Sequence, residues 1–175
     1  MSAMNEPVVR LVCFELCGEA FAFNMEHLIE IVQIRPSEIT PCSTPVPFVR
    51  GSWIYRATPI YIIDVREFFH LTGAKSSVHA STPHEPASKE KRDKSMLVVQ
   101  IHGRVVGIFS DAVLQVVPLG IFYEYPDMIS TLPRQYFAGI IRIRETLALV
   151  LAIDELVSEY DLELLANMKS IEPAA

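Results

Sequence analysis

The sequence predicts a mainly β protein of two small barrels, each with about five short strands, followed by a C-terminal amphipathic helix. Half of the 175 residues are hydrophobic, which is ample for a packed interior. The apolar residues gather in short runs rich in Val, Ile, Phe and Tyr, as is typical of strands. One local pattern also recurs in both halves of the chain, and such self-similarity indicates an internal duplication.

Short apolar runs mark the expected strands in each half of the chain. Gly18 and Gly103 lie between the first two runs of each half, where a hairpin turn is needed. The remaining runs are spaced closely enough for small barrels. The expected strands are Val9–Leu16, Glu19–Phe23, Ser52–Tyr55, Ile60–Ile63, Met96–Ile101, Val105–Phe109, Ile140–Ile143 and Leu147–Ile153.

Four sites share a pattern in which an apolar run meets Asn or Asp and an apolar helical turn follows. They are centred on Asn24, Asp64, Asp111 and Asp154. A short polar side chain at this place can accept from the free N–H groups of a helix start, so we expect all four to be N-caps. The spacing supports the duplication, because 40 residues separate the first two and 43 separate the last two.

A second similarity between the halves lies before the second cap of each. There "FVRGSWIYR" resembles "FAGIIRIR", and Gly51 matches Gly139. We expect both glycines to serve structural turns. The duplication predicts a first barrel over about 8–72 and a second over about 96–157.

The segment between the halves, 73–95, has little apolar character and reads as a flexible insert. After the second barrel, "DELVSEYDLELLANMK" predicts an amphipathic helix over 154–169. Its expected apolar stripe is Leu156, Tyr160, Leu164 and Met168, with Val157 and Leu165 beside it.

Charge and hydropathy exclude several partners. The net charge of −6 and the pI of about 5.4 argue against nucleic acid and against anionic lipid surfaces. No signal peptide is evident at the N-terminus. The longest apolar run, Leu147–Ile153, is too short to span a bilayer, so we expect no direct membrane insertion and a cytoplasmic location.

Motifs of catalysis and of cofactor binding are missing from the sequence, which has no G-x-S-x-G, P-loop, G-x-G-x-x-G or H-E-x-x-H pattern. We therefore expect no catalytic residue, no cofactor and no metal. Cys13 and Cys17 would lie roughly 13 Å apart on a strand and suit core or edge positions better than a zinc site. His79 and His84 have no Cys or acidic pair set to help them bind a metal.

A binding or scaffolding protein is the first expectation from the residues alone, and an enzyme or small-ligand barrel is the second. Small barrels have limited interior, so a chain this apolar must leave some apolar surface for a partner. Phe122, Tyr123 and Tyr125 could stack a base, but their acidic surroundings favour a packed loop or a protein interface.

Three stretches in order resemble the CheW family of bacterial chemotaxis coupling proteins, over roughly residues 9–160. They are "FELCGEAFAFNMEHLIEIVQI", "FVRGSWIYRATPIYIIDVREFF", and "GRVVGIFSDAVLQVVPL" followed by "YFAGIIRIRETLALVLAIDELV". The resemblance implies two five-stranded SH3-like barrels around a shared core. It also implies a non-catalytic adaptor, recruited to membrane-associated receptor arrays.

The partners that the resemblance implies are the cytoplasmic tip of a chemoreceptor, the regulatory domain of a CheA-type histidine kinase, and other CheW-like domains. Arg56 falls on the family's pattern arginine, which is associated with these contacts. Leu28 and Glu30 fall on positions that also affect coupling. Ile54 and Ala57 lie beside Arg56 in the sequence and belong to the same expected surface.

Three positions depart from the family pattern. Ile54 replaces an Asn, Ala57 replaces a Gly, and Tyr61 replaces a Pro. These departures leave open an adaptor of a divergent pathway that controls pilus motility, surface sensing or a second messenger. For Arg56, the residues alone leave two roles open, an edge-strand salt bridge and an interface contact; the resemblance favours the interface.

Overall fold

The computed structural model describes residues 8–71, 94–124 and 133–168. Most of them lie in short strands, and the helices are short, so the predicted mainly β class is confirmed. The strands are β1 (Arg10–Leu16), β2 (Glu19–Asn24), β3 (Leu28–Ile34), β4 (Val49–Tyr55), β5 (Thr58–Ile63), β6 (Lys94–Ile101), β7 (Arg104–Ser110), β8 (Ala112–Pro118), β9 (Phe122–Tyr123), β10 (Phe137–Ile143) and β11 (Thr146–Leu151). The helices are α1 (Val65–Phe68), α2 (Ile153–Leu156) and α3 (Glu159–Met168), with 3-10 turns η1 (Met25–His27), η2 (Pro36–Glu38) and η4 (Arg134–Tyr136).

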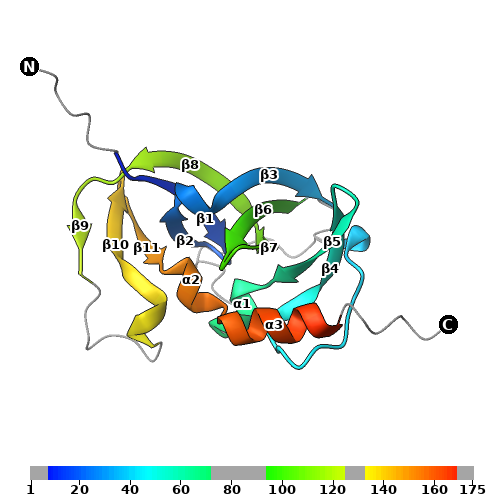
Figure 1. Ribbon diagram of the computed structural model, residues 1–175. Helices are drawn as coiled ribbons and strands as arrows, with labels where there is room; N and C mark the ends of the chain where they lie inside the picture. Colours follow the sequence, from blue (N-terminus) through cyan, green and yellow to red (C-terminus); the bar gives the residue numbers. More distant parts are fainter. Residues whose placement is uncertain (1–7, 72–93, 125–132, 169–175) are drawn as a thin grey trace, which may run out of the picture.

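The strands form two sheets. One has six strands in the order β8-β1-β2-β11-β10-β9, and the other has five in the order β3-β6-β7-β5-β4. In Figure 1 the edge strands β8 and β3 arch over one side of the molecule, and the three α-helices lie on the opposite side. A large cluster of buried residues joins both sheets to the helices, and includes Phe21 of β2, Leu97 of β6 and Leu162 of α3.

Each sheet contains strands from both halves of the chain. β1 and β2 join β8 to β11, whereas β6 and β7 join β3 to β5. The expected division into barrels over 8–72 and 96–157 therefore does not follow the sheets. The reason is that β3 pairs with β6 and β8 pairs with β1, so each half completes the sheet begun by the other half. Most of the expected insert 73–95 lies outside the described residues, and Lys94 and Ser95 begin β6.

The expected duplication is visible in the strand registers. Hairpin β1–β2 corresponds to β6–β7 with equivalent residues 85 positions apart, since Leu16 faces Glu19 as Ile101 faces Arg104. Hairpin β4–β5 corresponds to β10–β11 with equivalent residues 88 positions apart. Even the irregularities agree, because pairing shifts after Val49 in β4 and after its equivalent in β10. The two sheets are therefore equivalent, with strands exchanged between the halves.

Gly51 and Gly139 occupy equivalent places beside these shifts, within strands rather than at turns, which corrects the expected role. A Cβ on Gly51 would overlap the Thr40 carbonyl oxygen. A Cβ on Gly139 would overlap the Phe122 ring and lie 2.6 Å from the carbonyl oxygen of Tyr123. Both glycines are thus needed because the backbone of a neighbouring antiparallel segment lies against the strand there.

Alanine at either glycine is expected to destabilise the fold. Gly51→Ala and Gly139→Ala should each lower the free energy of unfolding by about 1–3 kcal/mol, because a backbone oxygen cannot move aside as a flexible side chain can. Urea denaturation checks this prediction. Gly120→Ala is the matched control, since a Cβ on Gly120 would meet nothing within 4 Å. Equal midpoints for all three variants would contradict the prediction.

Two of the four expected helix caps are confirmed. The side chains of Asn24 and Asp64 accept from the backbone N–H groups of Glu26 and Arg66. Asp111 caps no helix, because strand β8 follows it directly. Asp154 is also wrong as a cap, because it lies inside α2, whose N-cap position is Ala152. The apolar residues after Asn24 and Asp111 form β3 and β8, because pairing with distant strands outweighs their local helical spacing.

The helix expected over 154–169 is divided into α2 and α3. Ser158 begins the second helix, with its Oγ accepting from the backbone N–H of Asp161 at 3.1 Å. The new start shifts the helical phase away from the expected stripe. Leu165, expected beside the stripe, is buried in α3 together with Leu162, whereas Tyr160 is 68% exposed.

Candidate partner-binding surface

Arg56 lies in the two-residue turn between β4 and β5, not within a buried strand. Arg56 and Ala57 both have positive φ, at 46° and 65°. Two such residues give the turn a backbone twist that suits a tight hairpin. The turn therefore places a charged side chain at the end of the hairpin, next to solvent.

Glycine in place of Ala57 is expected to stabilise the protein. The left-handed conformation costs an L-residue about 1 kcal/mol that glycine avoids. Ala57→Gly should therefore raise the melting temperature by about 2–4 °C. Thermal unfolding followed by circular dichroism checks this, with Ala112→Gly as a control within a strand that should lower the melting temperature. A lower melting temperature for Ala57→Gly would show that the turn does not carry this strain.

Glu30 of β3 connects the turn to the opposite edge of the same sheet. Its Oε2 accepts from the Tyr55 hydroxyl at 2.7 Å and from Nη2 of Arg56 at 3.0 Å. The Arg56 guanidinium also lies over the Tyr55 ring, 5.1 Å from its centroid. Because β3 and β4 are the two edges of the five-stranded sheet, these contacts help to close that sheet into a barrel.

Hydrogen bonding and a neighbouring positive charge favour the ionised form of Glu30. The hydrogen bond from Tyr55, together with the nearby Arg56 charge, holds the pKa of Glu30 below its ordinary value. The same hydrogen bond raises the pKa of Tyr55, because it favours the protonated hydroxyl. At neutral pH the pair is therefore a guanidinium beside a carboxylate.

Solvent reaches most of this arrangement. The Arg56 side chain is 71% exposed and that of Glu30 is 41% exposed. Ile54, at the end of β4, is 61% exposed. We define Ile54, Tyr55, Arg56, Ala57 and Glu30 as the Arg56 surface. It combines an exposed ion pair with an exposed aliphatic side chain, which is the composition of a protein-binding surface rather than of a catalytic site.

The expected residues are brought together only in part. Arg56 and Glu30 are in contact, and Ile54 and Ala57 adjoin them in the turn. Leu28 is half-buried and packs against the main core instead. Tyr55 was missed by the sequence reasoning, although its place beside Arg56 in a strand of alternating burial could have indicated it. The salt bridge considered for Arg56 is present within the chain, and it leaves the guanidinium accessible.

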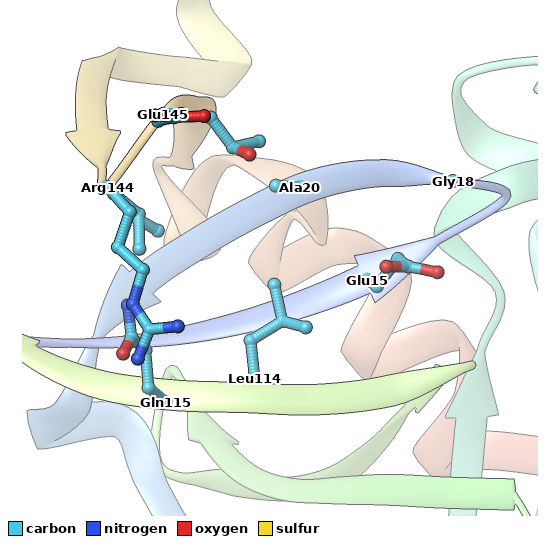
Figure 2. A pocket seen from close by; sticks show the side chains of 9 residues that line it. Glu15, Gly18, Ala20, Leu114, Gln115, Arg144 and Glu145 are labelled. Carbon is cyan, nitrogen blue, oxygen red and sulfur yellow. The ribbon is translucent and has the colours of Figure 1, made fainter.

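The equivalent place in the six-stranded sheet has different chemistry. There Arg144, with φ of 55°, corresponds to Arg56, while Gln115 stands for Glu30 and Ile143 for Tyr55. These residues line a pocket of about 680 Å³, in which the Arg144 side chain extends toward β8 (Figure 2). Of these two equivalent places, only the Arg56 surface has a carboxylate, Glu30, hydrogen-bonded to a hydroxyl, that of Tyr55.

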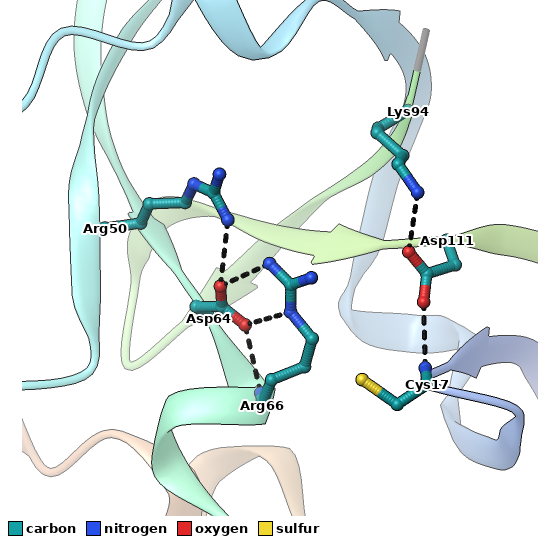
Figure 3. Close-up of polar contacts among 6 residues, drawn as sticks. All are labelled: Cys17, Arg50, Asp64, Arg66, Lys94 and Asp111. Carbon is teal, nitrogen blue, oxygen red and sulfur yellow. Dashed lines mark hydrogen bonds and ion pairs between the residues drawn. The ribbon is translucent and has the colours of Figure 1, made fainter. Parts of the chain in front are cut away.

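A second group of charges ties α1 to the sheets (Figure 3). Asp64 accepts from Nη1 of Arg50 at 3.2 Å and from Nη2 of Arg66 at 2.7 Å, and its side chain is only 3% exposed. Asp111 accepts from Lys94 Nζ and from the Cys17 backbone N–H, both at 2.8 Å. We name Asp64, Arg50 and Arg66 the Asp64 cluster and assign it a structural role, because its carboxylate is buried and fully paired.

Neither a metal site nor a membrane-spanning helix is found where the structure describes the chain. Across 8–71, 94–124 and 133–168, no three His, Cys, Asp or Glu side chains are placed to hold a metal ion. Over the same ranges, no helix is long and apolar enough to cross a membrane. His79, His84 and Tyr125 lie outside the described residues.

Comparisons with known proteins agree with this geometry. The sequence model of a family described as CheW-like domain matches residues 10–161. The chain is 25% identical over 171 residues to "Chemotaxis protein CheW" of Treponema pallidum (strain Nichols), covering 95% of the chain and 92% of that protein. The crystal structure of scaffolding protein TtCheW from Thermoanaerobacter tengcongensis has a TM-score of 0.69 at 20% identity, covering 92% of the chain and 96% of TtCheW. The structural likeness shows the fold, two SH3-like subdomains.

Proposed function

The chain belongs to the CheW-like domain family, and from this premise we propose that it couples the cytoplasmic tips of chemoreceptors to the regulatory domain of a CheA-type histidine kinase. The family acts as a scaffold in chemotaxis signalling and is not enzymatic, so the expectation of a non-catalytic protein is confirmed. Coupling of receptors and kinase in general follows from that role. Contact with the receptor tip and with the regulatory domain of the kinase is what we propose beyond that general role.

The exposure of the Arg56–Glu30 pair is the main observation that supports a role for these two residues in partner binding. A guanidinium that is 71% exposed and anchored by a carboxylate is preorganised to meet a partner carboxylate. Ile54 beside it offers apolar area that gains from burial on binding. Charged and apolar groups together suit a specific interface, in which the charges fix the register of the partners.

Further apolar area lies on the edge strand β3. Ile29 and Ile31 are 42% and 39% exposed, and they flank Glu30 along the strand. Because successive side chains of a strand face opposite sides, a partner that contacts Arg56 and Glu30 buries Ile29 and Ile31 only if it also covers the other face of this edge strand. This arrangement supports a protein partner rather than a small ligand, since the surface is a strand edge and not an enclosed pocket.

Affinity capture from the native cell lysate tests the proposal. The tagged chain is expected to retain a chemoreceptor and a CheA-type kinase, whereas the Arg56→Glu variant should retain less of at least one. The recovered proteins also separate flagellar chemotaxis from the divergent pathways that Ile54, Ala57 and Tyr61 leave open. Recovery of neither a receptor nor a kinase would reject the proposal.

A further inference from the structure

A pocket of about 420 Å³ lies in the six-stranded sheet, on the side of the molecule that carries α2. Its described walls come from β1, β2, η1, β9, β10, β11 and α2, so it is distinct from the Arg56 surface. We name it the Asn24 pocket. Its lining includes Leu11, Asn24, His27, Leu119, Phe122, Ala138, Val150, Ala152 and Asp154.

The internal duplication gives each wall of the Asn24 pocket an equivalent in the five-stranded sheet. The registers relate Leu11, Asn24, Leu119, Phe122 and Val150 to Met96, Phe109, Ile34, Ile39 and Ile62, in that order. Those five equivalents pack against one another as a closed core cluster. The same place is therefore filled in one sheet and open in the other.

The difference follows from one aromatic ring. Phe109 is 2% exposed and packs within the closed cluster, whereas its equivalent Asn24 is small and polar. The Asn24 side chain is also engaged elsewhere, since it accepts from the backbone N–H of Glu26 and donates to its carboxylate. Two of the apolar walls are consequently left exposed, while Leu11 and Val150 remain buried. Leu119 and Phe122 are 40% and 41% exposed, while their equivalents are 1% and 8% exposed.

Charge differs at the same place. In the closed cluster, the guanidinium groups of Arg50 and Arg66 lie over the Phe109 ring, 4.8 and 5.0 Å from its centroid. Asp64 holds both of them. The equivalents of Arg50, Arg66 and Asp64 at the Asn24 pocket are Ala138, Asp154 and Ala152. The pocket thus lacks both guanidinium groups and carries the half-exposed carboxylate of Asp154 in place of Arg66. Within the chain this carboxylate lies 3.6 Å from Nε2 of His27, which also lines the pocket.

We propose that the Asn24 pocket binds a segment of a partner protein that carries an aromatic side chain next to a lysine or arginine. The ring of the partner takes the place that Phe109 fills in the other sheet, against Leu119 and Phe122. The cation of the partner pairs with Asp154, at the position of the Arg66 guanidinium. The five-stranded sheet thus provides, from its own residues, the chemistry that the six-stranded sheet takes from a partner. The inference does not depend on the identity of the receptor or the kinase.

Dipeptide probes test this inference on the full chain. N-acetyl-Arg-Phe-amide is titrated into ¹⁵N-labelled protein, and saturable shifts are expected at the amides of Asn24, Phe122 and Asp154, with an affinity of about 1 mM, as suits so small a ligand. N-acetyl-Arg-Ala-amide tests the need for the ring, and N-acetyl-Glu-Phe-amide tests the need for the cation. Both should bind at least about fivefold more weakly.

Two variants make the result specific to the pocket. Ala138→Trp fills the pocket from an exposed strand position and should abolish the shifts. Asp154→Arg, at a half-exposed side chain, should reverse the preference toward N-acetyl-Glu-Phe-amide, and it keeps the test decisive if the first variant does not fold. Three outcomes would overturn the inference: no saturable shift, equal binding of all three probes, or unchanged binding by the filled, folded variant.

Discussion

Asp64→Ala is expected to lower the free energy of unfolding by about 3 kcal/mol, since it leaves two guanidinium groups without their shared carboxylate and removes the cap of α1. Asp64 accepts four hydrogen bonds, three from Arg66 and one from Arg50. Asp64→Asn can keep the backbone cap but loses the charge, so a smaller loss is expected. Equilibrium urea denaturation of Asp64→Ala, Arg50→Ala and the double variant checks the coupling. The double variant should lose less free energy of unfolding than the sum of the two single losses.

The pH dependence of stability should report the same carboxylate. Burial alone would raise the pKa of Asp64, but the hydrogen bonds and charge of Arg66, together with the hydrogen bond from Arg50, outweigh it and bring the pKa below its ordinary value. The stabilisation is therefore fully present above the unfolded pKa of about 4 and is lost as the pH falls through the lower, folded pKa. Asp64→Asn should flatten the acid limb of the stability curve. An unchanged acid limb would contradict this account of the cluster.

Arg56→Ala is expected to reduce receptor-dependent control of the kinase by about tenfold, the effect of one interface residue worth about 1.4 kcal/mol. The fold should remain intact, because the side chain is largely exposed and its ion pair with Glu30 lies at the surface. Kinase activity in a mixture of receptor membranes, kinase and the variant measures this, with circular dichroism to confirm folding.

Arg144→Ala is the matched control for Arg56→Ala, because Arg144 holds the equivalent turn position in the other sheet without the carboxylate and hydroxyl partners. It should change kinase control less than Arg56→Ala does. If Arg56→Ala unfolds the protein, the residue is structural. If it folds and leaves kinase control unchanged, the Arg56 surface is not the coupling surface.

Local sequence predicted those elements whose partners are near in the chain. The hairpins around Gly18 and Gly103, and the strands on either side of Arg56, depend on short turns and on alternating apolar residues. Gly51 and Gly139 were also recognisable as equivalent positions. The reason for the glycines could be seen only in the structure, where the backbone of a neighbouring segment leaves no room for a Cβ.

Elements with distant partners could not be predicted in the same way. β3 contains apolar residues at helical as well as strand spacing, and its pairing with β6 decides in favour of a strand. Asp111 resembles a helix cap, but its carboxylate binds the Cys17 N–H group, 94 residues away. The candidate site shows the same limit, because Arg56 could be identified from the turn, whereas its contact with Glu30 requires the sheet to close into a barrel.

The scaffold role is tested most directly by co-sedimentation of a CheA-type kinase with membranes that contain the cognate chemoreceptor. We expect the kinase to sediment with the membranes when the chain is added, to remain largely in the supernatant without it, and to sediment poorly with Arg56→Glu. Kinase that sediments to the same extent with and without the chain would contradict the claim that this protein couples receptor to kinase.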